Sequence, residues 1–282
     1  MDLGIAGRVA LVTAASAGLG RGSALALADE GAKVVVCARG EERLRRTEAD
    51  LAARSEALAV VEDVTDPEAP RRLVDATVGR FGRLDILVAN AGGPPPGRAL
   101  EVDDDAFWGA LEANLLTSVR LVREAVPHMR ERRWGRICLI TSVSVKQPIP
   151  NLALSNSART GLWAWAKTAA PDLFEEGITL NLACPGNHAT ERAKQLRTAQ
   201  GVPMGDPEDF GRVVAVPLLR AGQLRERGGP PGRRCPDRRS PLRVQAKTAC
   251  VLRHARPADR WLKRHAGSFR PDPERVTGQI WS

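Results

Sequence analysis

The stretch "VTAASAGLGRG" (residues 12–22) follows a short apolar run and precedes a segment with helical periodicity. A glycine-rich turn in this position lets backbone N–H groups and the N-terminus of the helix face a pyrophosphate. Gly18 and Gly20 would let a ligand approach the backbone closely. Such glycines can also serve close packing alone, but the strand before this turn and the helix after it favour a dinucleotide-binding site.

Around this turn the chain alternates short apolar runs with longer amphipathic segments. The apolar runs predict strands at residues 9–13, 33–38, 57–63, 84–90, 136–142 and 178–184. The amphipathic segments predict helices at residues 19–30, 41–54, 67–80, 104–131 and 156–175. Continuous apolar character is typical of parallel strands buried on both faces. We therefore predict an α/β fold, a doubly wound (Rossmann-type) parallel sheet that forms a single domain over residues 1–216.

Basic residues are concentrated in the last part of the 282-residue chain, whose net charge is +9. Residues 217–282 hold 16 Lys and Arg against 5 Asp and Glu, whereas residues 1–216 hold 26 against 28. The basic segment is rich in Pro and Gly and has no helical or strand period. It cannot bury enough apolar surface to offset its ordering entropy, so we predict a basic, irregular tail.

The change in character at about Val216 is abrupt. One hypothesis is a shifted reading frame in a GC-rich gene, which resequencing that confirmed the present codons would exclude. The alternative is a basic extension specific to this lineage. Nucleic-acid binding through the tail is a further hypothesis, which a steep salt dependence would support. The tail lacks the interleaved aromatic residues of a base-stacking surface, which argues against it.

Several observations bear on location. No apolar run approaches the roughly 20 residues that a membrane-spanning helix needs. The N-terminal "MDLGIAGRVALVT" does not have the pattern of a signal peptide. The five cysteines show neither close pairing nor metal-ligand spacing. We expect a cytoplasmic protein that uses neither a membrane nor a metal.

Arg39 stands at the end of the second predicted strand, the position that separates the two nicotinamide cofactors. An acid there would bind the ribose 2′-hydroxyl of NAD, whereas an arginine accommodates the 2′-phosphate of NADP. A solvated arginine at the head of a helix is the alternative. Arg21 would add a second phosphate contact, and Asp63 and Val64 would meet the adenine. The sequence therefore predicts NADP(H) as cofactor.

Three segments resemble the short-chain dehydrogenase/reductase family, and within it the branch of 3-oxoacyl-acyl-carrier-protein reductases. "TAASAGLG" (13–20) stands where the family has Thr-Gly-x-x-x-Gly-x-Gly, with Ala14 in place of the first glycine. "NAG" (90–92) is intact, and "CPGNHAT" (184–190) matches the segment that closes over the nicotinamide. The resemblance covers residues 7 to about 216. It implies cofactor contacts from Thr13, Ser16, Gly18, Leu19, Gly20, Asn90, Ala91, Gly92, Pro185, Gly186 and Thr190.

The catalytic positions match the family only in part. Asn114 in "LEANLLTSV" and Ser142 in "LITSVSV" match its catalytic asparagine and serine. The family's tyrosine follows the serine by thirteen residues and its lysine follows four later, which places Ser155 and Arg159 at those positions. The chain contains no tyrosine at all. The resemblance assigns Asn114, Ser142, Ser155 and Arg159 to the catalytic site, with Arg159 also toward the nicotinamide ribose.

Loss of the phenol changes the expected chemistry. A phenol with a pKa near ~10, lowered by a nearby ammonium, is a suitable acid for carbonyl reduction. The hydroxyl of Ser155 is less acidic and shorter, and the guanidinium of Arg159 is a poor member of a proton relay. His188 has a suitable pKa, although the simpler expectation for it is a solvent-exposed loop residue.

Two functions remain open from the sequence. The first is an NADP(H)-dependent oxidoreductase that acts on a carbonyl or alcohol, and the resemblance suggests a 3-oxoacyl thioester as substrate class. The alternative is a cofactor-binding, catalytically weak or inactive protein that acts as a sensor or structural partner. We also expect a homo-oligomer, a dimer through helices 104–131 and 156–175, because the tail replaces a segment that forms one interface in the family.

Overall fold

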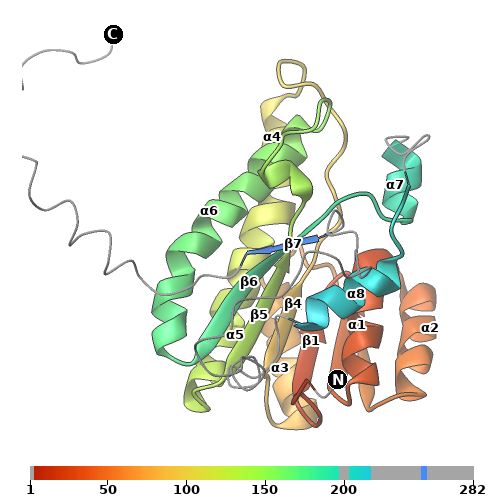
Figure 1. The fold of residues 1–282 in the computed structure, drawn as a ribbon, viewed down its shortest axis with the longest axis vertical. Coiled ribbons are helices and arrows are strands. Elements are labelled where there is room, and N and C mark those ends of the chain that lie inside the picture. Colours follow the sequence, from red (N-terminus) through yellow and green to blue (C-terminus); the bar gives the residue numbers. More distant parts are fainter. Residues whose placement is uncertain (1–2, 197–202, 217–248, 253–282) are drawn as a thin grey trace, which may run out of the picture.

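One seven-stranded sheet, in the order β3-β2-β1-β4-β5-β6-β7, runs through the part of the chain that the computed structural model describes, residues 3–196, 203–216 and 249–252 (Figure 1). Its strands are β1 (Val9–Val12), β2 (Lys33–Ala38), β3 (Ala57–Val61), β4 (Ile86–Ala89), β5 (Gly135–Ile140), β6 (Ile178–Pro185) and β7 (Ala249–Leu252). The first six strands are parallel to one another, and their ends agree with the predicted runs to within two residues. The predicted doubly wound parallel sheet is confirmed.

Helices cover both faces of this sheet. They are α1 (Gly18–Asp29), α2 (Glu41–Ala52), α3 (Ala69–Phe81), α4 (Asp104–Leu111), α5 (Thr117–Glu131), α6 (Ala153–Glu175), α7 (Glu191–Leu196) and α8 (Pro207–Ala215). Successive strand residues point to opposite faces, as a pleated strand requires. Ala10 and Val12 join the apolar cluster under α1, α2 and α8, whereas Leu11 joins the cluster under α3, α5 and α6. Two separate cores therefore hold the sheet between two helical layers.

The predicted helix at residues 104–131 is interrupted. A π-helical turn, η1 (Glu112–Leu116), separates α4 from α5. The backbone N–H and the hydroxyl of Thr117 both donate to the carbonyl oxygen of Glu112, the latter at 2.9 Å. Helical periodicity is too coarse to reveal one additional residue in a turn. The break concerns a predicted site residue, because Asn114 lies within η1.

The predicted tail is not irregular throughout. Strand β7 pairs antiparallel with β6, with Cys184 opposite Cys250 in the register. The expectation of no strand after Val216 is therefore wrong at residues 249–252, where a four-residue edge strand is too short to show a period. Residues 217–248 and 253–282 of the predicted tail lie outside the described residues. Within the described part of the chain, no helix has the length and apolar character to cross a membrane.

Helix α8 packs directly on the backbone of α1, and Figure 1 shows the two helices side by side. A Cβ atom added to Gly211 would overlap the carbonyl oxygen of Gly22. A Cβ added to Gly22 would in turn overlap the carbonyl oxygen of Pro207. Phe210 and Val214 are buried beside this contact. Glycine on both helices is what allows their backbones to approach so closely.

Candidate functional site

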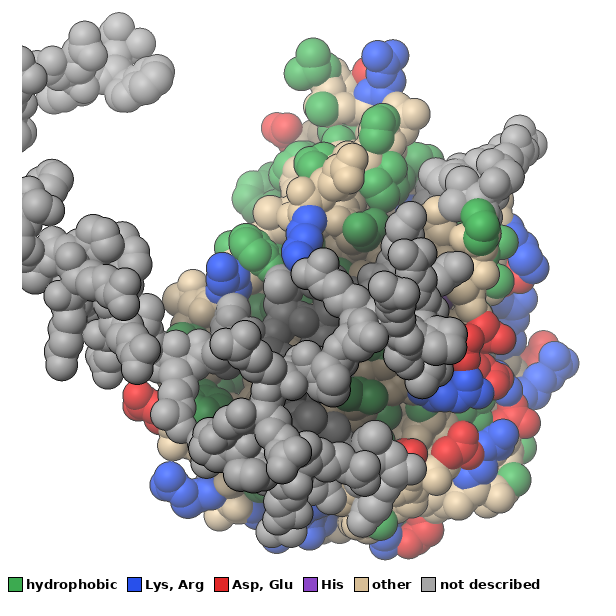
Figure 2. All heavy atoms as spheres, in the orientation of Figure 1, with side chains coloured by type: hydrophobic (Ala, Val, Ile, Leu, Met, Phe, Trp, Pro, Cys, Tyr) green, Lys and Arg blue, Asp and Glu red, His purple; other side chains and the backbone are tan. Residues whose placement is uncertain are grey.

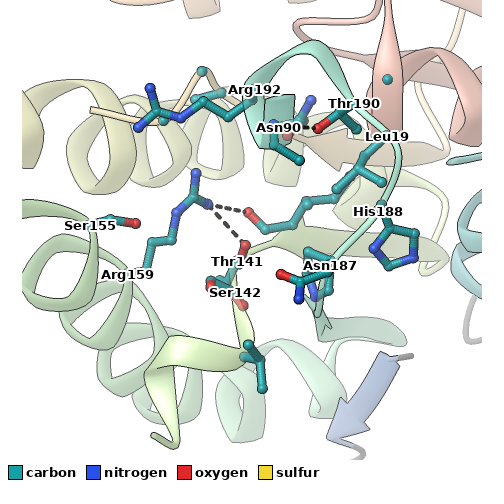
Figure 3. Close-up of a pocket in the computed structure, with 18 of the residues that line it drawn as sticks. Leu19, Asn90, Thr141, Ser142, Ser155, Arg159, Asn187, His188, Thr190 and Arg192 are labelled. Carbon is teal, nitrogen blue, oxygen red and sulfur yellow. Dashed lines mark hydrogen bonds between the residues drawn. The ribbon is translucent and has the colours of Figure 1, made fainter. Parts of the chain in front are cut away.

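A cavity of about 560 Å³ lies at the carboxyl ends of the parallel strands (Figure 3). Its wall joins the turn after β1, the segment after β4, the end of β5, helix α6 and the segment from β6 into α7. The predicted residues that line it are Gly18, Leu19, Asn90, Ala91, Gly92, Ser142, Ser155, Arg159, Pro185, Gly186 and Thr190. Ligands of open α/β sheets bind in this position.

Gly18 and Gly20, in the turn after β1, have different structural roles. Gly18 begins α1 with a φ of +57°, a backbone conformation that favours glycine, and it lines the cavity. A Cβ atom on Gly18 would lie 3.2 Å from Cγ2 of Thr190 and would narrow the space at the helix N-terminus. Gly20 does not line the cavity, and its Cβ would lie 2.5 Å from the carbonyl oxygen of Ala14. Gly18 therefore fits the ligand role, and Gly20 serves packing.

Thr13 ties this turn to the segment after β4. Its Oγ1 donates to the carbonyl oxygen of Asn90 at 2.7 Å and accepts from the backbone N–H of Asn90 at 2.8 Å. The side-chain Nδ2 of Asn90 donates to the carbonyl oxygen of Ala14 at 3.3 Å. Thr13 is fully buried and does not line the cavity. It positions the two turns that do.

Ala14 has a φ of +48°, in the left-handed region, where the resembled family has glycine. This conformation costs an L-residue about 1–2 kcal/mol. Glycine avoids that strain, but it lowers the free energy of unfolding by about 0.4–1 kcal/mol because it raises the conformational entropy of the unfolded chain. We expect Ala14→Gly to leave the free energy of unfolding unchanged or to raise it by up to about 1 kcal/mol. Urea denaturation followed by circular dichroism measures the change.

The control for this prediction is Ala15→Gly in the same turn. Ala15 is buried and its φ is not positive. Loss of a buried methyl group and a looser unfolded chain should lower its free energy of unfolding by about 1 kcal/mol or more. Equal destabilisation by the two substitutions would show that the backbone conformation of Ala14 carries no strain.

The residues predicted for the adenosine end lie outside the cavity wall. Ser16, Arg39, Asp63 and Val64 are not among its lining residues. Arg39 has a side chain that is 79% exposed, and its Nη1 lies 3.7 Å from Oδ2 of Asp63. Arg21 is engaged elsewhere, by Asp50 at 2.6 Å and Glu208 at 3.7 Å. The exposed guanidinium of Arg39 stays the candidate for the 2′-phosphate contact, whereas that of Arg21 is paired with two acidic side chains.

Ser142, Ser155 and Arg159 meet at the opposite end of the cavity. Oγ of Ser142 accepts from the backbone N–H of Ser144 at 3.1 Å, at the start of the short 3₁₀ helix η2 (Val143–Val145). Nη1 of Arg159 donates to the carbonyl oxygens of Ile140 at 3.0 Å and Thr141 at 3.2 Å. These bonds fix the guanidinium at the end of β5. The structure thus brings together three of the four predicted catalytic side chains.

The pKa of Arg159 is set by its surroundings. Burial lowers it to about 10, and the like charge of Arg192 acts in the same direction. At neutral pH the group therefore stays protonated. It can donate hydrogen bonds and hold an anion, but it does not release a proton.

Asn114, the fourth predicted catalytic residue, does not line the cavity. It is 2% exposed, and neither Oδ1 nor Nδ2 has a hydrogen-bond partner among the described residues. A buried amide without partners is unfavourable unless water or a ligand supplies them. Its site in the π-helical turn agrees with the tendency of such turns to occur at functional positions.

His188 is buried, so the expectation of a solvent-exposed loop residue is wrong. It is 3% exposed and packs edge-to-face on Phe210, with ring centroids 5.2 Å apart. Nδ1 lies 3.2 Å from the carbonyl oxygen of Gly186, which can only accept, so Nδ1 carries the proton. Burial lowers the pKa of the imidazole. His188 lines the cavity as a neutral side chain.

Sequence reasoning missed Arg192, which lines the cavity two residues after Thr190. Its Nη2 donates to the carbonyl oxygen of Pro94, and its side chain lies against Gly93. Arg192 thereby joins the start of α7 to the segment after β4. The available signal was a basic residue two positions after the segment "CPGNHAT" (184–190), but the direction of its side chain depends on how α7 folds back over the cavity.

Comparisons with known proteins agree with this geometry. The family described as short chain dehydrogenase matches residues 8–201. L-fucose dehydrogenase of Oryctolagus cuniculus is 37% identical over 227 residues, 79% of this chain and 77% of that protein. The 3-oxoacyl-acyl-carrier-protein reductase of Escherichia coli is 32% identical over 220 residues, 78% of this chain and 86% of that protein. The crystal structure of L-sorbose reductase from Gluconobacter frateurii, complexed with NADPH and L-sorbose, is 29% identical with a TM-score of 0.73, and the match covers 78% of this chain and 92% of that chain.

Proposed function

Because this chain belongs to the short-chain dehydrogenase family, we propose that it is an NADP(H)-dependent oxidoreductase that acts on a carbonyl or an alcohol. The observation that carries the proposal is one cavity whose wall joins Gly18 at the N-terminus of α1 to Ser142 and Arg159 at the end of β5. The relatives include dehydrogenases and reductases of sugars and of 3-oxoacyl thioesters. A 3-oxoacyl thioester is the substrate class that we propose first.

The residues present fit a nicotinamide dinucleotide. The unobstructed space beside Gly18, which a Cβ atom would narrow, and the N-terminus of α1 suit a pyrophosphate. Arg39 would hold the 2′-phosphate, and the guanidinium of Arg159 would donate to the hydroxyls of the nicotinamide ribose. When bound, the cofactor supplies or accepts the hydride. Ser142 would donate a hydrogen bond to the substrate oxygen and polarise the carbonyl.

Proton transfer is the weak step of this site. Ser155 lies in the cavity wall, but an alkyl hydroxyl is too weak an acid to replace a phenol. Arg159 stays protonated at neutral pH, and His188 is neutral with its single proton directed to the carbonyl oxygen of Gly186. Water would therefore deliver the proton, and we expect slow turnover.

Fluorescence titration with NADPH and NADH tests the proposal. We expect NADPH to bind at least tenfold more tightly than NADH, because Arg39 has an exposed guanidinium available for the 2′-phosphate. Arg39→Gln should weaken NADPH binding about tenfold and leave NADH binding unchanged. The control is Arg46→Gln, an exposed arginine of α2 that pairs with Glu42. Equal affinity for both cofactors, or an equal effect of the two substitutions, would contradict the assignment of Arg39.

The second candidate function is a cofactor-binding protein with weak or no catalysis, a sensor or a structural partner. The pair Ser155 and Arg159 favours it, because neither side chain moves a proton as tyrosine and lysine would. A cavity that still accommodates a cofactor is compatible with both functions. A variant with tyrosine at position 155 and lysine at position 159 distinguishes the two functions, and its expected activity is given in the Discussion.

The proposed dimer through α4, α5 and α6 stays a prediction. Trp108 on α4 is 68% exposed, and Phe174 near the end of α6 is exposed as well. Figure 2 shows hydrophobic side chains gathered over the upper part of the described surface, where α4 and the start of α6 lie. Such surface is typical of an interface. A cytoplasmic location and the shifted reading frame likewise stay predictions.

A further inference from the structure

Two arginines, Arg159 and Arg192, face the same part of the cavity. Arg159 is 8% exposed and Arg192 is half-buried, and neither forms an ion pair within the described ranges of the chain. Figure 3 shows both guanidinium groups on the side of the cavity that carries Ser155, away from Leu19 and Thr190. Buried charges are ordinarily paired. The proposed contact of Arg159 with the ribose hydroxyls of the cofactor would not compensate either charge, because those hydroxyls are neutral.

Each guanidinium is held in place by hydrogen bonds to backbone carbonyl oxygens and has further N–H groups that can donate to a ligand. The bonds of Arg159 to the carbonyl oxygens of Ile140 and Thr141 use only Nη1. The bond of Arg192 to the carbonyl oxygen of Pro94 uses only Nη2. The remaining nitrogens have no hydrogen-bond partner among the residues that the structure describes. Donors fixed on two planar groups are the arrangement that binds a carboxylate through several bonds.

The positive charge of Arg192 also acts on Arg159. Burial lowers the pKa of Arg159 to about 10, with the charge of Arg192 adding to the effect, and burial lowers the pKa of Arg192. Both stay protonated at neutral pH. The acidic neighbour Glu191 pairs with Lys194 at 2.9 Å and is exposed, so it does not compensate them. An anion between the two groups would relieve their repulsion.

We propose that Arg159 and Arg192 bind a carboxylate group of the substrate, so that the natural substrate, a 3-oxoacyl thioester or another carbonyl or hydroxy compound, carries a free carboxylate. That the carboxylate belongs to a substrate rests on the proposed function. Val143, Ile149 and Leu152 line the neighbouring wall of the cavity and suit an apolar remainder of that molecule. The other source of an anion is a cofactor phosphate, for which the N-terminus of α1 at Gly18 is the expected site.

Isothermal titration of the full chain with oxamate and with its neutral isostere oxamide tests the site, first without cofactor and then with NADPH. We expect oxamate to bind at least about tenfold more tightly than oxamide, because charge-assisted hydrogen bonds are lost with the charge. Arg192→Gln should weaken oxamate binding about tenfold and change NADPH binding less than about twofold. The control is Arg98→Gln, an exposed arginine of the segment after β4 that pairs with Glu101 and does not line the cavity.

Each outcome decides something. Equal binding of oxamate and oxamide, or oxamate binding that Arg192→Gln leaves unchanged, overturns the proposal. Loss of NADPH binding in Arg192→Gln without oxamate binding in the parent chain assigns the pair to a cofactor phosphate and also overturns it. Charge-selective oxamate binding in a chain that binds neither NADPH nor NADH supports the anion site and contradicts the proposed oxidoreductase.

Discussion

A variant with both Ser155→Tyr and Arg159→Lys is expected to turn over a 3-oxoacyl thioester about 10²–10⁴ times faster than the parent chain. The phenol would enter the cavity that Ser155 lines, on the same side as Ser142. A lysine at position 159 would lower the pKa of the phenol toward the working range, which the present serine cannot reach. The measurement is kcat for acetoacetyl-coenzyme A, followed by NADPH absorbance, beside the dissociation constant of NADPH.

The two single substitutions are the controls. Ser155→Tyr alone should gain less than the pair, because Arg159 is fixed by the carbonyl oxygens of Ile140 and Thr141 and does not relay protons. Arg159→Lys alone should gain nothing, since no acid is added. An unchanged kcat in the double variant, with NADPH binding intact, would mean that the cavity is incompetent for another reason. The catalytically weak, cofactor-binding function would then be preferred.

Gly211→Ala is expected to lower the free energy of unfolding by about 3 kcal/mol or more, at the upper end of what overpacking costs. The added methyl group would overlap the carbonyl oxygen of Gly22, and a backbone group cannot move aside as a side chain does. α8 would have to separate from α1. Because Phe210 of α8 packs on His188 in the cavity wall, NADPH binding should weaken as well. Chemical denaturation and the NADPH titration measure the two effects.

The matched control is Gly79→Ala, in the last turn of α3. A Cβ atom at Gly79 meets no atom within 4 Å in the described part of the chain, so the same substitution adds only helical propensity. We expect it to raise the free energy of unfolding by about 0.5–1 kcal/mol. If Gly211→Ala were as stable as Gly79→Ala, the close contact between α1 and α8 would not exist in solution.

Most of the sheet could be predicted from the sequence because β1, β2, β4, β5 and β6 are almost entirely buried on both faces. In β2, for example, the five residues after Lys33, "VVVCA" (34–38), are all apolar. The interruption at η1 could not be predicted, since it depends on hydrogen bonds between Thr117 and Glu112 rather than on composition. Strand β7 could not be predicted either, because it lies far along the chain from its partner β6 and is only four residues long.

The residues of the candidate site that belong to a backbone motif could be predicted from the sequence. Those whose place in the site depends on the direction of a side chain could not. Gly18, Asn90 and Thr190 follow from their places at strand and helix ends, and all three line the cavity. His188 and Arg192 depend on how residues beyond β6 fold back, which no local pattern records. The burial of His188 rests on Phe210, a contact that exists only once α8 has packed on α1.

The π-helical turn η1 also fixes how sequences of this kind have to be compared. A π turn accommodates one more residue than an α turn, and each residue advances a helix by about 100°. The apolar stripe of α4 therefore continues into α5 with its angular phase displaced by that amount. A helical wheel drawn without a break through residues 104–131 merges two different sides of the helix pair. An ungapped alignment with a regular helix places one of the two halves out of phase.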